Sequence, residues 1–133
     1  MLSSYLRFSP YPLDNPLFNC GRGAVFDISG KHDLEASVAV SHSPEYARLS
    51  PNRKGAAVTL LKHVKNPILL AKQLYLDEES CPHAFVSGAD AERIAGEKGL
   101  EIVDEHYFDT PWVIVLHDLL TIAGTCELNI DSQ

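Results

Sequence analysis

Residues 55–76, with the sequence GAAVTLLKHVKNPILLAKQLYL, decide the fold class of this chain. The run Gly55–Val64 is short, apolar and contains β-branched residues, which is typical of a buried strand, although periodicity alone leaves a helix of that length open. Asn66 is of a type that caps helix N-termini, and Pro67 suits the first helical position. Apolar residues then follow at helical spacing, at Leu70, Ala71 and Leu74. We therefore expect a strand over 55–64 and a helix over 67–76.

The sequence on the C-terminal side of this helix predicts a second strand and a second helix. His83–Val86 has the composition of a short strand. Ser87 followed by Asp90 resembles a capping box, which begins a helix, and Gly99 is typical of the residue that ends one. We therefore expect a helix from Ser87 through Lys98.

The N-terminal side predicts loops and a hairpin. Residues 1–19 contain three prolines and predict a loop with little regular structure. Ala24–Ile28 and Leu34–Val40 are short and largely apolar, and the turn residues Ser29–Asp33 between them predict a β-hairpin. The polar stretch 41–54 shows no apolar period and predicts a mobile loop between two strands. The alternation of strands and helices along the chain indicates an α+β fold.

Charge and composition narrow the classes of partner. Eleven Lys and Arg residues against 18 Asp and Glu residues give the 133-residue chain a net charge of −7. A negative field repels phosphate backbones and anionic lipids, so we expect neither nucleic acid nor a membrane surface as a partner. The longest apolar stretches fall short of the roughly 20 residues that a membrane-spanning helix needs. Length and composition are those of one globular domain.

Two features predict a cytoplasmic protein. Arg7, Pro10 and Pro12 interrupt the first residues before a long apolar core can form, which does not support a secretory signal. The cysteines are odd in number and irregularly spaced, which fits reduced thiols better than a disulfide framework. They are Cys20, Cys81 and Cys126.

Several blocks of sequence, in a fixed order and spacing, carry a resemblance to a known family. They are Asn15–Val25 (NPLFNCGRGAV), Leu34–Val38 (LEASV), Gly55–Val58 (GAAV), Val64–Ile68 (VKNPI) and Leu70–Ala71. Over roughly residues 13–109 the chain resembles the α-half of the plant-type asparaginase and isoaspartyl aminopeptidase family of N-terminal nucleophile hydrolases. The resemblance implies a partial αββα sandwich that lacks the family's first strand and its β-half.

The resemblance divides the chain into two parts. Residues 1–110 form the asparaginase-like α-half, which is partial, and residues 111–133 form a divergent C-terminal tail. From Pro111 onward, including Trp112–Leu116, the sequence no longer looks like the family.

Members of this family carry a nucleophile that this chain does not match. A precursor cleaves itself, and the new N-terminal threonine of the β-half attacks an amide or isopeptide carbonyl with its own α-amine as base. Gly124-Thr125 shares only two letters with the family's Gly-Thr-Val-Gly type motif, and cleavage before Thr125 leaves too little chain for a β-half. The resemblance therefore assigns no catalytic and no substrate-binding residue here.

Two functions are compatible with that resemblance. The first is a truncated asparaginase or isoaspartyl peptidase-like protein that is inactive alone. The second is a non-catalytic interaction module that binds a β-half or a full-length relative.

The glycine-rich turn at Asn19, Gly21 and Gly23 has two interpretations. From the residues alone it is a tight turn that enters a strand. The resemblance implies a loop whose main-chain carbonyls hold a structural Na⁺, since hard cations take oxygen ligands, and it places Asn19 near the nucleophile of the partner half. The positions that match the cation loop are Leu13, Phe18, Cys20 and Arg22. We expect no other cofactor.

The other candidate side chains favour ordinary structural roles. Cys81-Pro82-His83 offers two potential ligands where structural zinc needs four, so we expect surface or strand-edge placement. Cys20 has no histidine adjacent in sequence and is expected to be a buried, inert thiol rather than a nucleophile. His42 is expected in a solvated loop and His63 at a strand end. The charged residues of the second helix are expected on its solvated face, at Glu92, Arg93, Glu97 and Lys98.

The predicted strands also bear on self-association. An isolated α-half leaves sheet edges without their β-half partners, and an unpaired edge is a template for pairing with another chain. We therefore expect self-association, unless the apolar segment Trp112–Ala123 folds back and covers an edge.

Overall fold

The described residues form a three-stranded sheet with two helices on one face. The structure, a computed structural model, describes residues 15–40, 53–79 and 81–128. The strands are β1 (Leu34–Ala39), β2 (Gly55–Leu61) and β3 (Phe85–Ser87), in the order β1-β2-β3. Strand β2 is antiparallel to β1 and parallel to β3. This is the α+β class that the sequence predicts.

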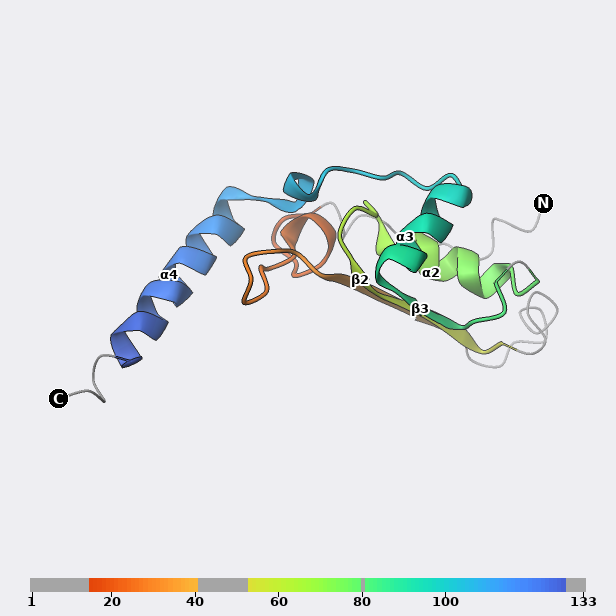
Figure 1. The fold of residues 1–133 in the computed structure, drawn as a ribbon, viewed down its shortest axis with the longest axis horizontal. Coiled ribbons are helices and arrows are strands. Elements are labelled where there is room, and N and C mark those ends of the chain that lie inside the picture. Colours follow the sequence, from red (N-terminus) through yellow and green to blue (C-terminus); the bar gives the residue numbers. More distant parts are fainter. Residues whose placement is uncertain (1–14, 41–52, 80, 129–133) are drawn as a thin grey trace.

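The helices follow the strands along the chain. They are α2 (Pro67–Leu76), α3 (Gly88–Glu97) and α4 (Pro111–Leu128), with short 3₁₀ turns η1 (Gly21–Gly23) and η3 (Glu105–Phe108). Helix α2 contacts β1 and β2, and α3 contacts β2 and β3. Both lie on one side of the sheet, whereas α4 projects away from it (Figure 1). Within the described ranges, none of the helices combines the length and apolarity needed to cross a bilayer.

Apolar side chains from the sheet and from α2 and α3 form the core between them. On the strands, Leu34, Val38 and Val58 are buried, as the alternation of a half-buried sheet requires. The helices contribute Leu70, Ala71, Leu74, Ala91 and Ala95, none of which is exposed to solvent. Each Å² of apolar surface removed from water stabilises the folded state by about 25 cal/mol, so this layer is the main source of stability.

The opposite face of the sheet is not covered by these helices. The register places Ser37, Ala57 and Phe85 side by side across the three strands. Phe85 is 62 % exposed. In the next row on this face, the Thr59 hydroxyl donates to the Glu35 carboxylate at 3.1 Å. The described sheet therefore has one packed face and one open face.

The predicted helix over 67–76 is confirmed at both ends. Pro67 occupies the start and Asn66 the N-cap position, although the Asn66 side chain makes no capping hydrogen bond. The second helix also begins after its predicted N-cap, Ser87, but the predicted capping box is wrong because Ser87 makes no side-chain cap bond. At the other end, Gly99 has a φ of +71° and its N–H donates to the Gly96 carbonyl. A positive φ here is what glycine permits at a helix C-terminus.

The predicted hairpin is wrong. Leu34–Ala39 is a strand, but Ala24–Ile28 is not, and β1 pairs with β2 instead. The cause is Asp27, whose carboxylate accepts hydrogen bonds from the backbone N–H groups of Ser29 and Lys31, at 2.7 and 3.0 Å. These bonds turn the chain where a strand would need an extended backbone. They also lower the pKa of the Asp27 carboxyl to about 2.

Strand β2 ends at Leu61, three residues before the predicted limit at Val64. Leu60 has a φ of +55°, which interrupts the extended backbone. The Glu92 carboxylate of α3 then accepts hydrogen bonds from the N–H groups of Lys62 and His63, each at 2.6 Å. Backbone groups bound in this way are no longer free for a sheet ladder. The strand predicted at 83–86 is likewise shifted, to 85–87.

The loop predicted over 41–54 lies largely outside the described residues, as does most of the N-terminal loop. Arg53, at its end, is buried, with 6 % of its surface exposed. Its guanidinium donates to the carbonyls of Leu74 and Cys81, the latter at 2.6 Å. Arg53 therefore joins the end of α2 to the segment that leads into β3.

Candidate functional site

The glycine-rich turn brings main-chain carbonyls together. The Cys20 N–H donates to the Phe18 carbonyl at 2.7 Å, and the Gly23 N–H donates to the Cys20 carbonyl at 3.1 Å. Each carbonyl oxygen has two lone pairs, so one acceptor position on each oxygen is left by these bonds. The turn can therefore present oxygens to a ligand while it keeps its own hydrogen bonds.

Gly23 is a position in this turn that has no room for a side chain. A Cβ atom there would lie 2.1 Å from the Phe18 carbonyl oxygen and 2.8 Å from that of Pro16. Both distances are shorter than van der Waals contact allows. The Phe18 and Pro16 carbonyls therefore lie directly against Gly23, and carbonyl oxygens are the donors that a hard cation such as Na⁺ takes. Phe18, Cys20 and Arg22 belong to this turn, whereas Leu13 lies outside the described residues.

Asn19 holds the turn against the segment that follows it. Its side-chain oxygen accepts a hydrogen bond from the Val25 N–H at 3.0 Å. This bond spans six residues and closes the loop around η1. The described part of the chain therefore gives Asn19 a local structural role.

Aromatic and cationic side chains tie this turn to η3. The Arg22 guanidinium lies 5.7 Å from the centroid of the Tyr107 ring, and the Lys65 ammonium lies 5.5 Å from it. Cations at such distances are attracted by the ring. Lys65 also forms an ion pair with Glu101 at 2.9 Å. The turn is therefore held by contacts that are distant in sequence.

A His-Asp-His cluster that the sequence analysis did not single out lies beside η3. The Asp109 carboxylate bonds His32 Nε2 with one oxygen and His106 Nδ1 with the other, each at 2.9 Å. His32 is buried and stacks on Phe26, with ring centroids 4.3 Å apart. No local sequence motif predicts this cluster, because 77 residues separate His32 from Asp109.

Charges within the cluster shift its titration. Partial burial acts to raise the pKa of Asp109, but hydrogen bonds from His106 and His32 and the charges of these rings outweigh it and lower that pKa. The hydrogen bond to Asp109 and the negative charge around it raise the pKa of His106. Nδ1 of His32 is buried without a hydrogen-bond partner in the described structure.

The open face of the sheet carries a shallow groove of about 410 Å³. The side chains at its centre are small, namely Ser37, Ala57 and Thr59, and Phe85 forms one wall. Small side chains on an open sheet face allow close approach of a second layer. The groove is thus suited to protein packing.

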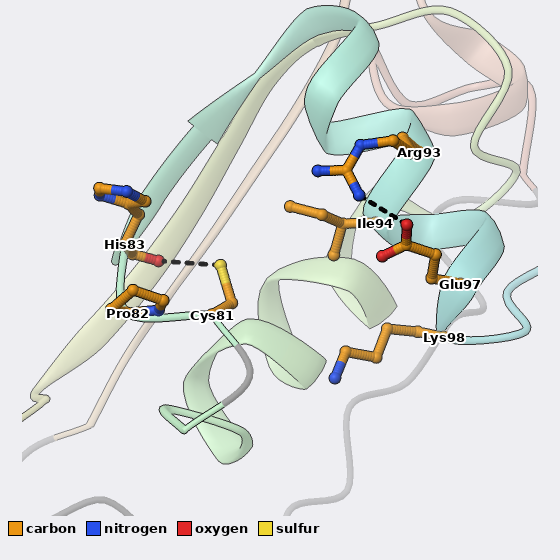
Figure 2. A pocket seen from close by; sticks show the side chains of 7 residues that line it. All are labelled: Cys81, Pro82, His83, Arg93, Ile94, Glu97 and Lys98. Carbon is orange, nitrogen blue, oxygen red and sulfur yellow. Dashed lines mark hydrogen bonds and ion pairs between the residues drawn. The ribbon is translucent and has the colours of Figure 1, made fainter.

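A second pocket, of about 310 Å³, lies between the segment that leads into β3 and helix α3 (Figure 2). Cys81 is buried on one side, and its thiol lies 3.6 Å from the His83 carbonyl. Across the pocket, Arg93 pairs with Glu97 at 2.5 Å and Lys98 with Asp77. The charged groups thus pair with one another, and His83 points to solvent.

The described side chains favour neither a metal site nor a cysteine nucleophile. In the described ranges, no three His, Cys, Asp or Glu side chains are arranged to hold a metal ion. Partial burial raises the pKa of the Cys20 thiol, which disfavours the nucleophilic thiolate. Cys20 is half-buried, so the expected full burial is wrong.

The structure bears on the predictions for two histidines and on the solvated face predicted for the second helix. His63 lies just beyond β2, as predicted, and His42 lies outside the described residues. Arg93 and Glu97 are exposed, but Glu92 is not a simple solvated residue, because its carboxylate binds the backbone after β2.

Thr125 lies within α4, and its backbone nitrogen belongs to a helical peptide. In that position it has no α-amine that could act as a base. The described structure therefore does not present Thr125 as an N-terminal nucleophile.

Comparison with known proteins extends over most of the chain. Residues 13–116 match the model of a family described as asparaginase. The chain is 38 % identical over 96 residues to a probable isoaspartyl peptidase/L-asparaginase 2 of Arabidopsis thaliana, an alignment that covers 72 % of this chain and 26 % of the relative. It is 35 % identical over 116 residues to an isoaspartyl peptidase of Salmonella typhimurium, covering 87 % and 33 %. A plant-type L-asparaginase of Pyrococcus abyssi is 31 % identical over 91 residues, covering 68 % and 26 %.

These alignments cover only part of each relative. The chain corresponds to between about a quarter and a third of the length of these curated relatives. The matched family range ends at residue 116, within α4.

Proposed function

Because this chain belongs to the asparaginase family, we propose that it supplies the supporting α-half of a threonine-nucleophile amidohydrolase and is inactive on its own. The substrates of the assembled site would be asparagine or β-aspartyl peptides. The observation that carries the proposal is the sheet itself, which is packed by helices on one face and open on the other.

The open face supports the idea of a second half. In a sandwich, two sheets pack face to face at about 10 Å, and small side chains at the contact allow this approach. Ser37, Ala57 and Thr59 provide such a surface. A β-half that laid its own sheet here would complete the αββα arrangement that the family resemblance implies.

Catalysis of this kind needs the threonine, its own α-amine and an oxyanion-stabilising site in one place. The described residues provide no threonine with a free amine, since Thr125 lies inside a helix. We therefore infer that the chain contributes positioning groups, with Asn19 beside the nucleophile of the partner half.

The glycine-rich turn would hold Na⁺ in this arrangement. Its donors would be the carbonyls of Phe18, Cys20 and Arg22, with Leu13 as a fourth. The close packing at Gly23 supports this role, because only a residue without a side chain lets the Phe18 and Pro16 carbonyls keep their positions in the turn. The cation would brace the turn that carries Asn19.

The test is the release of ammonia from asparagine, and of aspartate from a β-aspartyl dipeptide, by the purified chain. We expect no activity above that of the Thr125→Ala variant. Turnover by the chain that is abolished in Thr125→Ala would contradict the proposal, because it would identify a nucleophile within this chain.

A second function, a non-catalytic interaction module, is favoured by the same open face. The two functions differ in the effect of binding on the partner. An α-half confers activity on the β-half that it captures, whereas an interaction module binds a β-half or a full-length relative and leaves its rate unchanged.

A further inference from the structure

Residues 24–33 run from the glycine-rich turn to β1 without joining the sheet. In the described structure none of these residues belongs to a strand, and the next residue, Leu34, begins β1. A segment outside a sheet has no ladder of backbone hydrogen bonds to fix its place. Its position therefore depends on the side chains that hold it against other parts of the protein.

A small closed loop gives the middle of this segment a defined shape. The Asp27 N–H donates to the Lys31 carbonyl at 2.7 Å, which closes the loop. The residues on either side of the loop, Phe26 and His32, are thereby brought together, and their rings stack with centroids 4.3 Å apart. The two rings form one packed unit, so a contact that holds His32 also holds Phe26.

The stacked rings are linked to the glycine-rich turn through Asn19. Its side-chain oxygen accepts a hydrogen bond at 3.0 Å from the N–H of Val25, the residue before Phe26. A shift of the Phe26 backbone moves the Val25 amide as well, because the peptide unit between them is planar and fixed in length. The place of the Asn19 side chain is therefore coupled to that of the two rings.

Turn η3 and the residue after it hold this arrangement to the body of the protein. The Asp109 carboxylate bonds Nε2 of the buried His32 at 2.9 Å. The centroid of the Tyr107 ring lies 5.7 Å from the guanidinium of Arg22 in the glycine-rich turn. Phe108 is 0 % exposed and anchors η3 in the core. The bond to Asp109 is the stronger contact, because its acceptor is ionised, whereas Arg22 is exposed.

Asp109 is itself held in one orientation. Nδ1 of His106, within η3, binds its second carboxylate oxygen, also at 2.9 Å. A carboxylate that is bound at both oxygens has a fixed direction toward His32. Glu105 differs in this respect, because it lines the same pocket but forms no ion pair with either histidine in the described structure.

We propose that Asp109 is a positioning residue, which sets the place of the glycine-rich turn and of Asn19 through the rings of His32 and Phe26. That Asn19 then stands beside the nucleophile of a partner half rests on the proposed function. That Asp109 fixes the turn does not rest on it, so two experiments test the two statements separately.

The first experiment measures the solvent exchange of backbone amides in the full chain by NMR. We expect Asp109→Ala to speed exchange at Val25 by about fivefold or more and exchange in α2 by less than about twofold, because the local bond opens without global unfolding. Glu105→Ala is the matched control and should exchange like the parent chain. Asp109→Asn keeps an oxygen acceptor without the charge, so its exchange at Val25 should be about twofold faster than in the parent. This variant decides the outcome if Asp109→Ala does not fold.

Three results would overturn the proposal. One is an exchange rate at Val25 that neither Asp109 variant changes. Another is equal acceleration at Val25 and in α2, which would make Asp109 a general stabiliser of the fold. The third is equal acceleration by Glu105→Ala, which would assign the effect to the charge of η3 and not to the bond with His32.

The second experiment tests the consequence for catalysis. The chain is combined with the nucleophile-bearing β-half of a family member, and kcat and KM for asparagine are measured. We expect Asp109→Ala to lower kcat about tenfold and to leave KM within about threefold, because a misplaced group beside the reacting atoms acts mainly on the transition state. Glu105→Ala should keep the parent values. An unchanged kcat in Asp109→Ala would overturn the link to Asn19. A mixture that is inactive with every chain would contradict the proposed function, and the exchange rates would still decide the role of Asp109.

Discussion

Helices α2 and α4 begin with the same local signal and differ in their surroundings. Asn66-Pro67 precedes one and Thr110-Pro111 the other, and each proline occupies the first helical turn. Helix α2 then buries Leu70 and Leu74 completely, whereas the outward side of α4 stays in solvent. A local signal is thus sufficient to start a helix, but burial depends on a partner that the rest of the chain must supply.

The largest expected effect is the loss of folding stability when a buried leucine of α2 is shortened. Leu74→Ala removes a side chain that is 0 % exposed, and we expect it to lower the free energy of unfolding by about 2–5 kcal/mol. The matched change in α4, Leu120→Ala, should cost less than about 0.5 kcal/mol because that side chain is already in water. Urea denaturation measures both. Equal losses would break the comparison, because they would mean that α4 is packed as tightly as α2.

An intermediate effect is expected at the glycine-rich turn. Gly23→Ala forces a methyl group against the Phe18 carbonyl and should cost about 1–3 kcal/mol. Gly96→Ala in α3 is the control, since its Cβ would contact nothing and helix propensity favours alanine by about 0.5–1 kcal/mol.

The same variant tests the proposed cation. The parent chain should melt at a higher temperature in Na⁺ than in a larger monovalent cation, because a ligand that binds the folded state stabilises it. Gly23→Ala should abolish that difference. Melting curves of the parent chain that coincide in the two salts would remove the Na⁺ assignment.

The smallest effect is expected from the His-Asp-His cluster, as a dependence of stability on pH. Asp109 has a lowered pKa, so its contribution is present above its ordinary pKa of 3.8 and is lost as the pH falls through the folded value. His106 has a raised pKa, so its contribution is present below 6.5 and is lost as the pH rises through the folded value.

The two contributions therefore coincide between about pH 4 and 6.5. Thermal melts of the parent chain and of Asp109→Asn across pH 3–9 should differ most in that window and less on either side. Melting temperatures that differ by a constant amount at all pH values would show that the ion pairs do not stabilise the fold.

The sequence was informative where structure depends on neighbours along the chain. The cap-and-proline signal predicted both ends of α2, and Gly99 predicted the end of α3. The same signal at Thr110-Pro111 could have revealed α4, although the family resemblance indicates only a divergent tail there. As Figure 1 shows, this helix extends away from the sheet rather than covering an edge of it.

The predictions from sequence were wrong or incomplete where a side chain binds distant residues or the backbone next to it. The Asp27 carboxylate replaced the expected hairpin strand with a turn. Glu92 ended β2 from a helix about 30 residues away, and Arg53 joined two segments that the sequence left separate. No periodic pattern or local spacing reports such contacts, so they could not be read from the chain.

The most direct test of the central claim, that this chain is an α-half that needs a partner, is reconstitution. The full chain is co-expressed and purified with the nucleophile-bearing β-half of a family member, and ammonia release from asparagine is measured for each half and for the mixture. We predict a stable complex and activity only in the mixture, reduced by Asn19→Ala in the chain. Full activity of the β-half without the chain, or a mixture in which no complex forms, would contradict the account.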